Sequence, residues 1–227
     1  MDYHETSAWT RYLELREARP SAFRSGALEI VTDPRLVDDF FKTTGKQLGV
    51  LYESPYHLLV VDLVRRSADG VEAGDLLFPY ERLLPAAESG AVVAVPMYQG
   101  RFVLLRQYRH ALREEMLAFP RGFGEKGLSG EENLRKELRE EIGTAEVGNI
   151  RFLGTVAADS GILATKAEVF LCDVSRPRIE KGYEGIAALE LLSESELSEL
   201  IGTGKIADGF TLAAFALYAA GNRRQDA

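Results

Sequence analysis

Three glutamates, Glu137, Glu140 and Glu141, stand close together near the end of the stretch RGFGEKGLSGEENLRKELREEIG, residues 121–143. Carboxylate oxygens gathered in this way suit hard divalent cations such as Mg²⁺ or Mn²⁺, which prefer oxygen ligands and keep waters for a phosphate-bearing substrate. The alternative is a glutamate-rich helix turned to solvent, and the spacing alone leaves both interpretations open. A metal site is therefore the first hypothesis for this stretch.

A helix over 130–142 is predicted to carry the glutamates. Ser129 and Glu132 have the S-x-x-E spacing of a capping box at its start, and Gly143 can end it. The preceding loop, FPRGFGEKG over 119–127, contains three glycines. Glycine lets the backbone approach the helix start closely, and exposed amides there can contact a phosphate or shape a metal site.

A helical projection at about 100° per residue separates the charges of this helix. The stripe that should be buried consists of Leu134, Leu138 and Ile142. Glu141 lies next to this stripe, so we expect its carboxylate to be partly buried. Glu137 and Glu141 are four residues apart and repel each other by roughly 0.2–0.5 kcal/mol. In this projection the basic residues fall on the opposite flank, namely Arg135, Lys136 and Arg139. The projection therefore predicts that a bound cation compensates the charge of the glutamates.

The composition is that of an ordinary globular protein of 227 residues, with 46% hydrophobic and 27% charged residues. A net charge of −8 argues against binding to nucleic acid or to an anionic membrane, both of which favour a basic surface. The N-terminus does not have the pattern of a signal peptide, and no apolar run approaches the ~18 residues of a membrane span. We therefore expect a cytoplasmic protein. Cys172 is expected in the core, and the three histidines have no metal-ligand spacing.

An anionic ligand would need a local basic patch. The segment RFVLLRQYRHALR contains four arginines close together in the sequence, Arg101, Arg106, Arg109 and Arg113, which could form such a patch. The other interpretation is that they lie on a solvated surface.

Strands dominate the predicted structure of the first 85 residues. Apolar runs over 27–31, 48–54 and 56–66 are expected to be strands, the last two paired across a turn at Ser54 and Pro55. A short helix over 34–44 is predicted from the Asp33–Pro34 start and the glycine at position 45.

The pattern changes after residue 85. Two strands over 91–96 and 101–109 flank the turn MYQG and predict a hairpin. Further strands are expected over 150–158 and 166–174, followed by a helix capped by Ser193 and a final helix near 209–221. This alternation predicts an α/β or α+β sandwich.

The stretch from residue 121 resembles the Nudix box, G-x5-E-x7-R-E-U-x-E-E-x-G-U, where U is a bulky apolar residue. Six positions are in register: Gly122, Glu137, Leu138, Glu140, Glu141 and Gly143. Three positions depart: Leu128 for a glutamate, Lys136 for an arginine and Thr144 for an apolar residue. In the family that glutamate and that arginine help to hold the loop against the helix. Once the acid has become Leu128, an arginine at position 136 would lose its bidentate partner, so the two changes are compatible.

The resemblance covers roughly residues 86–222 and is clearest with the branch that includes ADP-ribose pyrophosphatases. RQYR before the box, the loop after it and the closing helix all resemble that branch. Ala118, Arg121 and Ser160 depart from its usual glutamate, alanine and proline. Since that proline is associated with a preference for ADP-ribose, Ser160 leaves the identity of the substrate open.

The resemblance implies a Nudix-type α/β/α sandwich with a mixed sheet over 86–227, preceded by a strand-rich arm over 1–85 that makes a homodimer. It implies a pyrophosphohydrolase that uses Mg²⁺ or Mn²⁺ to cleave the pyrophosphate bond of ADP-ribose or a related nucleoside diphosphate sugar. The implied metal ligands are three box carboxylates and a main-chain carbonyl: Glu137, Glu140, Glu141 and Arg121.

The remaining site residues follow from the same resemblance. A box glutamate, Glu140 or Glu141, or the later Glu184 would act as general base. Arg106, Arg109 and Gly122 would contact the substrate. The departures from the box leave a second hypothesis, a Nudix-like nucleotide-binding or regulatory module with weakened turnover.

Overall fold

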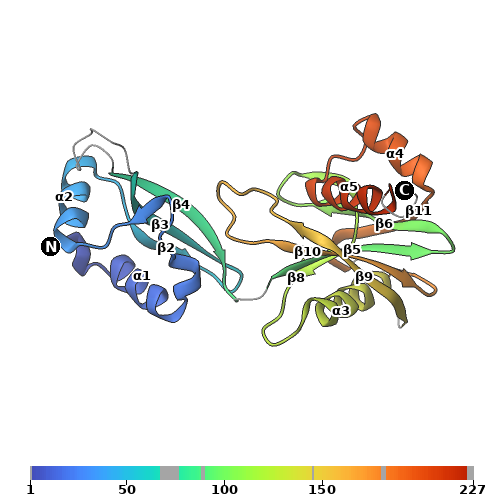
Figure 1. Cartoon of the computed structure of the whole chain (residues 1–227), viewed down its shortest axis with the longest axis horizontal. Coiled ribbons are helices and arrows are strands. Elements are labelled where there is room, and N and C mark those ends of the chain that lie inside the picture. The colour runs from blue at the N-terminus through green and yellow to red at the C-terminus, as the bar shows by residue number, and fades with distance from the viewer. Residues whose placement is uncertain (1, 67–76, 88–89, 145, 180–182, 224–227) are drawn as a thin grey trace. The chain divides into compact units, whose positions relative to one another are not determined.

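The structure is a computed structural model that describes the chain except for residues 1, 67–76, 88–89, 145, 180–182 and 224–227. The chain forms two compact units (Figure 1). The first comprises Met1–Ala86 and Asp159–Ala164, and the second comprises Ala87–Ala158 and Thr165–Ala227.

The first unit contains an antiparallel sheet in which β3 (His57–Arg66) is central. β1 (Leu28–Ile30) and β2 (Gly49–Glu53) pair with different parts of β3, and β4 (Leu77–Pro85) also pairs with it. The predicted strands and the pairing of β2 with β3 are confirmed. The loop Asp159–Ala164, which carries Ser160, lies along β4, because the Leu83 N–H donates to the Ile162 carbonyl at 2.8 Å.

Two helices pack in the first unit. The predicted helix over 34–44 is confirmed as α2 (Pro34–Thr44), with Asp33 as N-cap and Gly45 in the left-handed conformation at φ 67°. The helix α1 (Ser7–Ala18) was not predicted. Its buried residues Trp9, Tyr12 and Leu15 are spaced by three and form a narrow stripe, which is a weak periodic signal. Short 3₁₀ helices, η1 (Tyr3–Glu5) and η2 (Pro20–Phe23), flank it.

The second unit contains a mixed sheet in the order β11-β6-β5-β10-β9, with β7 beside β6 and β8 beside β5. β10 runs parallel to β5, whereas the other pairs are antiparallel. The strands are β5 (Ala91–Tyr98), β6 (Arg101–Arg109), β7 (Glu114–Ala118), β8 (Arg121–Phe123), β9 (Val147–Val156), β10 (Ala167–Val174) and β11 (Ile186–Leu192).

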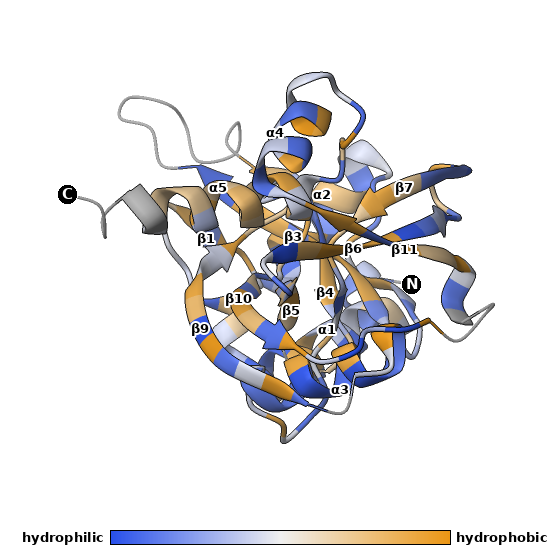
Figure 2. Cartoon of the chain, turned by 90° about the vertical axis from the view of Figure 1, so that its right-hand side faces the viewer, coloured by the Kyte–Doolittle hydropathy of each residue, from blue (hydrophilic) through white to orange (hydrophobic). Residues whose placement is uncertain are grey.

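Helices cover both faces of this sheet. Val103 and Leu105 of β6 share a core with α3 (Gly130–Ile142), while Phe102 and Leu104 share the opposite core with α4 (Glu194–Gly202) and α5 (Gly209–Arg223). This alternation is the pleat of a strand with both faces buried. α5 is apolar along most of its length, as Figure 2 shows. The predicted α/β/α sandwich with a mixed sheet is therefore confirmed, with η4 (Tyr183–Gly185) preceding β11.

Local details of two predictions differ from the structure. The hairpin turn is confined to Gln99 and Gly100, both at positive φ, whereas Met97 and Tyr98 belong to β5. Two residues at positive φ match the right-handed twist of the flanking strands. Part of the predicted glycine-rich loop is the strand β8, since its backbone pairs with β5.

Candidate active site

The helix α3 places the three glutamates as the projection predicted. Its capping box between Ser129 and Glu132 is present, and Gly143 ends it at φ 57°. Leu134, Leu138 and Ile142 are fully buried against the sheet. Glu141 is only 3% exposed, so it is more deeply buried than the partial burial that we predicted.

The carboxylate of Glu141 is held by a backbone group. The N–H of Arg121 donates to Glu141 Oε2 at 3.1 Å. Burial raises the pKa of Glu141 to about 8, the charge of Glu137 adds to this, and the Arg121 bond opposes it. A buried carboxylate with a neutral donor and an acidic neighbour is costly for the folded protein.

Glu137 lies directly against Gly122 of β8. A Cβ atom at position 122 would collide with the carboxylate of Glu137, so a glycine is required for steric reasons. Burial raises the pKa of Glu137 to about 7, where Lys136 opposes the rise and Glu140 and Glu184 add to it. β8 and α3 are therefore packed so closely that Glu137 and Glu141 both face the backbone of Arg121 and Gly122.

The prediction that the basic residues of α3 all lie opposite the acids is wrong for Lys136. Its Nζ is 2.6 Å from Glu140 Oε2, 3.3 Å from Glu125 Oε1 and 3.9 Å from Glu137 Oε1. Residues 136 and 140 are one turn apart, and the flexible lysine stem spans the angle between them. The bond to Glu140 raises the pKa of Lys136, so it is cationic.

The loop before α3 is fixed by hydrogen bonds to its backbone. The N–H of Glu125 donates to Asn133 Oδ1 at 2.9 Å, and Asn133 is 3% exposed. The N–H of Gly124 bonds to the Gly90 carbonyl. We did not predict a role for Asn133, although the projection places it beside the glutamates, which is the signal that identifies it.

Arg121 links the glutamates to the start of α5. Its Nη1 is 3.0 Å from Oδ2 of the buried Asp208, and its guanidinium lies 4.8 Å from the ring centre of Phe210. Asp208 in turn accepts bonds from the backbone and hydroxyl of Thr211. The side chain of Arg121 is therefore anchored, while its backbone contacts Glu141; its carbonyl as a metal ligand stays a prediction.

The structure treats the two predicted substrate arginines differently. Arg109 is partly buried and has a lowered pKa, first through burial and then through the charge of Arg121, while Asp208, Glu141 and Glu184 oppose the shift. Its Nε has no hydrogen-bond partner within the described part of the chain. Arg109 thus belongs to the electrostatic neighbourhood of the glutamates.

Arg106 is paired elsewhere. Its guanidinium bonds to Glu190 of β11, and alternation along β6 places it on the face opposite Leu105 and α3. The structure therefore does not bring Arg106 to the glutamates, and its contact with substrate stays a prediction.

Glu184 lies in η4 with an exposed side chain and an unusual backbone, φ 45° and ψ 32°. Its charge acts on Glu137, Glu141 and Arg109, so the structure brings it near the cluster. The Nε2 of buried Gln107 donates to the Glu184 carbonyl at 2.9 Å, a contact that we did not predict. Because buried Gln107 holds the left-handed backbone of Glu184, the fold determines where the Glu184 side chain leaves the backbone.

The donor set fits a hard divalent cation. Glu141 is buried, Glu137 is half-buried, Glu140 adjoins them on the same helix, and each supplies the oxygen donors that Mg²⁺ prefers. Burial and the charges of neighbouring acids raise the pKa values of Glu137 and Glu141, so a bound cation would stabilise their charged forms.

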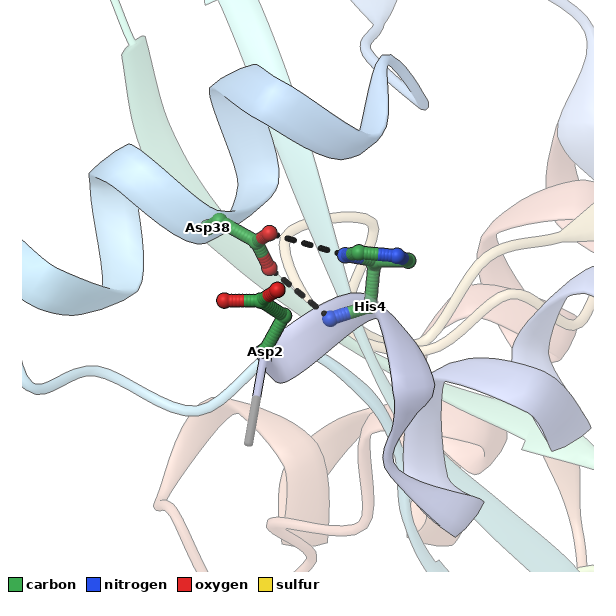
Figure 3. A group of neighbouring side chains, drawn as sticks. All are labelled: Asp2, His4 and Asp38. Carbon is green, nitrogen blue, oxygen red and sulfur yellow. Dashed lines mark hydrogen bonds and ion pairs between the residues drawn. The ribbon is translucent and has the colours of Figure 1, made fainter.

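A second group of potential ligand side chains, Asp2, His4 and Asp38, lies in the first unit (Figure 3). There the charges are paired within the protein. His4 Nδ1 is 2.8 Å from Asp38 Oδ2, and Lys42 Nζ is 3.4 Å from Asp2 Oδ1. The His4 backbone also donates to Asp38, so this group connects η1 to α2.

Comparison with known proteins decides the family. The model of the NUDIX domain matches residues 88–201, about half of the chain. This chain belongs to the NUDIX domain family. The match includes β5 to α3 and the three glutamates, and it confirms the predicted enzyme class, a Nudix-type pyrophosphohydrolase.

The chain is similar to two known ADP compounds hydrolases. The chain is 27% identical over 138 residues to the ADP compounds hydrolase NudE of Escherichia coli (strain K12), covering 58% of this chain and 73% of that protein. A crystal structure of an ADP compounds hydrolase superposes with a TM-score of 0.64 at 19% identity, covering 79% of this chain and 98% of that one. The latter similarity shows the fold. Among the described residues, none of the helices is long and apolar enough to cross a membrane.

Proposed function

We propose that this Nudix enzyme hydrolyses the pyrophosphate bond of ADP-ribose or a related nucleoside diphosphate sugar, with Mg²⁺ or Mn²⁺ as cofactor. The observation that carries the proposal is the packing of buried Glu141 and half-buried Glu137, with Glu140 beside them, on the backbone of β8. The similarity to a relative named for ADP compounds supports the substrate class.

The residues that would hold the metal are Glu137, Glu140 and Glu141, together with the carbonyl of Arg121. When bound, the ion neutralises charge on the diphosphate and makes a water more acidic. The burial of Glu141 and the low exposure of Glu137 strengthen the electrostatic interactions of these two carboxylates.

The chain itself orients the substrate and accepts a proton. Arg109, with its buried and unpaired Nε, supplies a cation and a donor for a phosphate or ribose oxygen. Gly122 allows the Glu137 carboxylate to lie against β8, and we propose that its backbone contacts the substrate. Glu184, exposed and close to the cluster, accepts the proton of the attacking water; a box glutamate, Glu140 or Glu141, is the other candidate.

An assay with a panel of nucleoside diphosphate sugars, which follows the release of the nucleoside monophosphate and the sugar phosphate, tests the proposal. We expect ADP-ribose or a close analogue to be cleaved with Mg²⁺ and not with EDTA. Glu140→Gln and Glu141→Gln should each lose roughly 10³-fold in rate, because each removes a charged ligand. Glu131→Gln, at an exposed position in the first turn of α3, is the matched control. Near-normal rates in both site variants would contradict the assignment.

A second function is favoured by the contacts of Lys136. Its bond to Glu140 and the exposed Leu128 are unlike the usual support of the Nudix box. These features suit a nucleotide-binding or regulatory module with little turnover. Binding of ADP-ribose without products, at every metal concentration, would establish this alternative.

We also propose that the first unit is a dimerisation arm and that the protein is a cytoplasmic homodimer. The arm and the dimer are inferred from the resemblance to relatives with an exchanged N-terminal segment. Light scattering of the whole chain should give twice the monomer mass of 25.1 kDa. A monomer at micromolar concentration would refute the dimer.

A further inference from the structure

Lys136 is placed between two kinds of acid. Glu137 and Glu140 are proposed metal ligands on its own helix, whereas Glu125 belongs to the loop before the helix. The Nζ of Lys136 is 2.6 Å from Glu140 and 3.3 Å from Glu125. Its side chain is about one quarter exposed, so these contacts are partly shielded from solvent.

An ammonium group beside metal ligands competes with the metal. It attracts the same carboxylate oxygens that the divalent cation needs, and its pairing with Glu140 must weaken for the ion to bind. A second acid that shares the ammonium reduces this competition. Such an acid has to be held in place, because an exposed side chain that is free to rotate gains little from a salt bridge.

The Glu125 side chain is 54% exposed, but the backbone from which it leaves is held in place. Its N–H is bonded to the side chain of Asn133, which is buried on the first turns of α3. This bond fixes where the Glu125 side chain leaves the loop. Leu128, three residues later, is apolar and 38% exposed, so it offers Lys136 no carboxylate.

We propose that Glu125 is a positioning residue, which holds Lys136 toward the loop and thereby keeps Glu140 and Glu137 available to the metal. The inference rests on the proposed metal site. In this protein Leu128 and Lys136 cannot form the acid–arginine pair that holds the loop against the helix in the family. We propose that Glu125 provides this support instead. Glu125 does not itself contact the substrate or the metal.

The test measures Mn²⁺ binding to the whole chain without substrate, by the electron paramagnetic resonance signal of free Mn²⁺. Glu125→Gln should weaken binding about threefold to fivefold, because Lys136 then pairs only with the metal ligands. In a Lys136→Met background, the same Glu125→Gln change should alter binding less than about 1.5-fold, since the competing ammonium is gone. Glu131→Gln, which makes an equal change in net charge on α3, should leave binding close to wild type.

Two results would overturn the inference. One is an equal loss from Glu125→Gln in both backgrounds, which means that Glu125 acts through charge alone. The other is wild-type binding by Glu125→Gln. Circular dichroism checks the fold of each variant, and Lys136→Gln replaces Lys136→Met in the cycle if the latter does not fold.

A reference variant separates this inference from the proposed function. Glu140→Gln should bind Mn²⁺ at least tenfold more weakly if the metal site is correct. Wild-type binding by Glu140→Gln refutes the metal site itself. Weak binding by Glu140→Gln together with an additive Glu125 and Lys136 cycle refutes only the role of Glu125.

Discussion

Two of the buried acids, Asp62 in the first unit and Glu141 in the second, have opposite kinds of partner. In the first unit, Asp62 on β3 is 2% exposed and accepts three hydrogen bonds: from Tyr12 Oη at 2.6 Å, from Arg82 Nε at 2.6 Å and from Arg82 Nη2 at 3.1 Å. In the second unit, Glu141 is equally buried, yet it accepts from a neutral backbone N–H and faces another acid, Glu137.

The difference separates an acid whose charge is paired within the fold from one that we propose to bind the metal. Asp62 has a charged partner that also bonds to the Ala22 carbonyl, so it joins β3, β4 and the segment at η2. Burial, and then the charge of Asp62, raise the pKa of Tyr12, so the hydroxyl stays a donor. In Glu141 the charged form is instead unfavourable in the protein alone, and a bound cation can stabilise it.

The largest effect is expected from Glu141→Gln, which should lower activity without lowering stability. Glu141→Gln should lower the rate of hydrolysis about 10³-fold, or ~4 kcal/mol, because a charged metal ligand is lost. In EDTA the same variant should melt at the wild-type temperature or higher, since a neutral amide costs less to bury than a carboxylate. Calorimetry and the hydrolysis assay give the two numbers. A large loss of stability without metal would show that Glu141 is structural, like Asp62.

Arg82→Met should do the reverse. It leaves Asp62 buried without its cation, which costs about 3–5 kcal/mol of unfolding free energy. Urea denaturation measures this loss, and the rate per folded molecule should not change. Arg11→Met is the matched control, because Arg11 forms an exposed pair with Glu53 at 2.8 Å worth less than ~1 kcal/mol. Equal losses in the two variants would contradict the contrast between buried and exposed pairs.

Gly122→Ala tests how closely β8 approaches Glu137. The added methyl group collides with the Glu137 carboxylate, so we expect a 10- to 100-fold lower rate, or about 1.4–2.7 kcal/mol, from displacement of a ligand. Gly148→Ala in β9 is the control, because a Cβ atom there meets open space. Steady-state kinetics at varied Mg²⁺ would show the defect, and an unchanged rate would mean that Glu137 moves freely.

The sequence predicted those features of the site that depend on neighbours along the chain. The capping box at Ser129, the cap at Ser193 and the glycine at the end of α3 are local motifs that were predicted, and the bounds of α2 and α3 were correct. The burial of Glu141 followed from its place beside the stripe of Leu134 and Ile142. The three acids were therefore identifiable before their surroundings were known.

The remaining features depend on residues that meet only in the fold. Nothing local to Arg121 indicates that Asp208 at the start of α5 will hold its guanidinium, or that Arg106 will pair with Glu190. The prediction for Lys136 failed for a different reason, since a projection of Cα directions ignores the reach of a long side chain. The helix α1 was missed because three buried residues in a narrow stripe give little periodicity.

The smallest expected effect compares two helices of the same unit that begin in the same way. Ser129 at α3 and Ser193 at α4 each form a capping box, with the serine hydroxyl near the N–H of the third residue and a glutamate returning the contact. Ser129→Ala and Ser193→Ala should therefore each cost about 1 kcal/mol of unfolding free energy.

Only Ser129→Ala, at the start of α3, should also weaken metal binding. Ser129 fixes the first turn, which contains Asn133's contact to the loop, and that loop carries Glu125 beside Lys136. Ser129→Ala should thus weaken Mn²⁺ binding about twofold, whereas Ser193→Ala should leave it unchanged, because α4 supplies none of the proposed ligands. Equal effects on Mn²⁺ binding would mean that the cap acts through overall stability. A difference confined to α3 would show that the helix start and the acidic cluster at its end are mechanically connected.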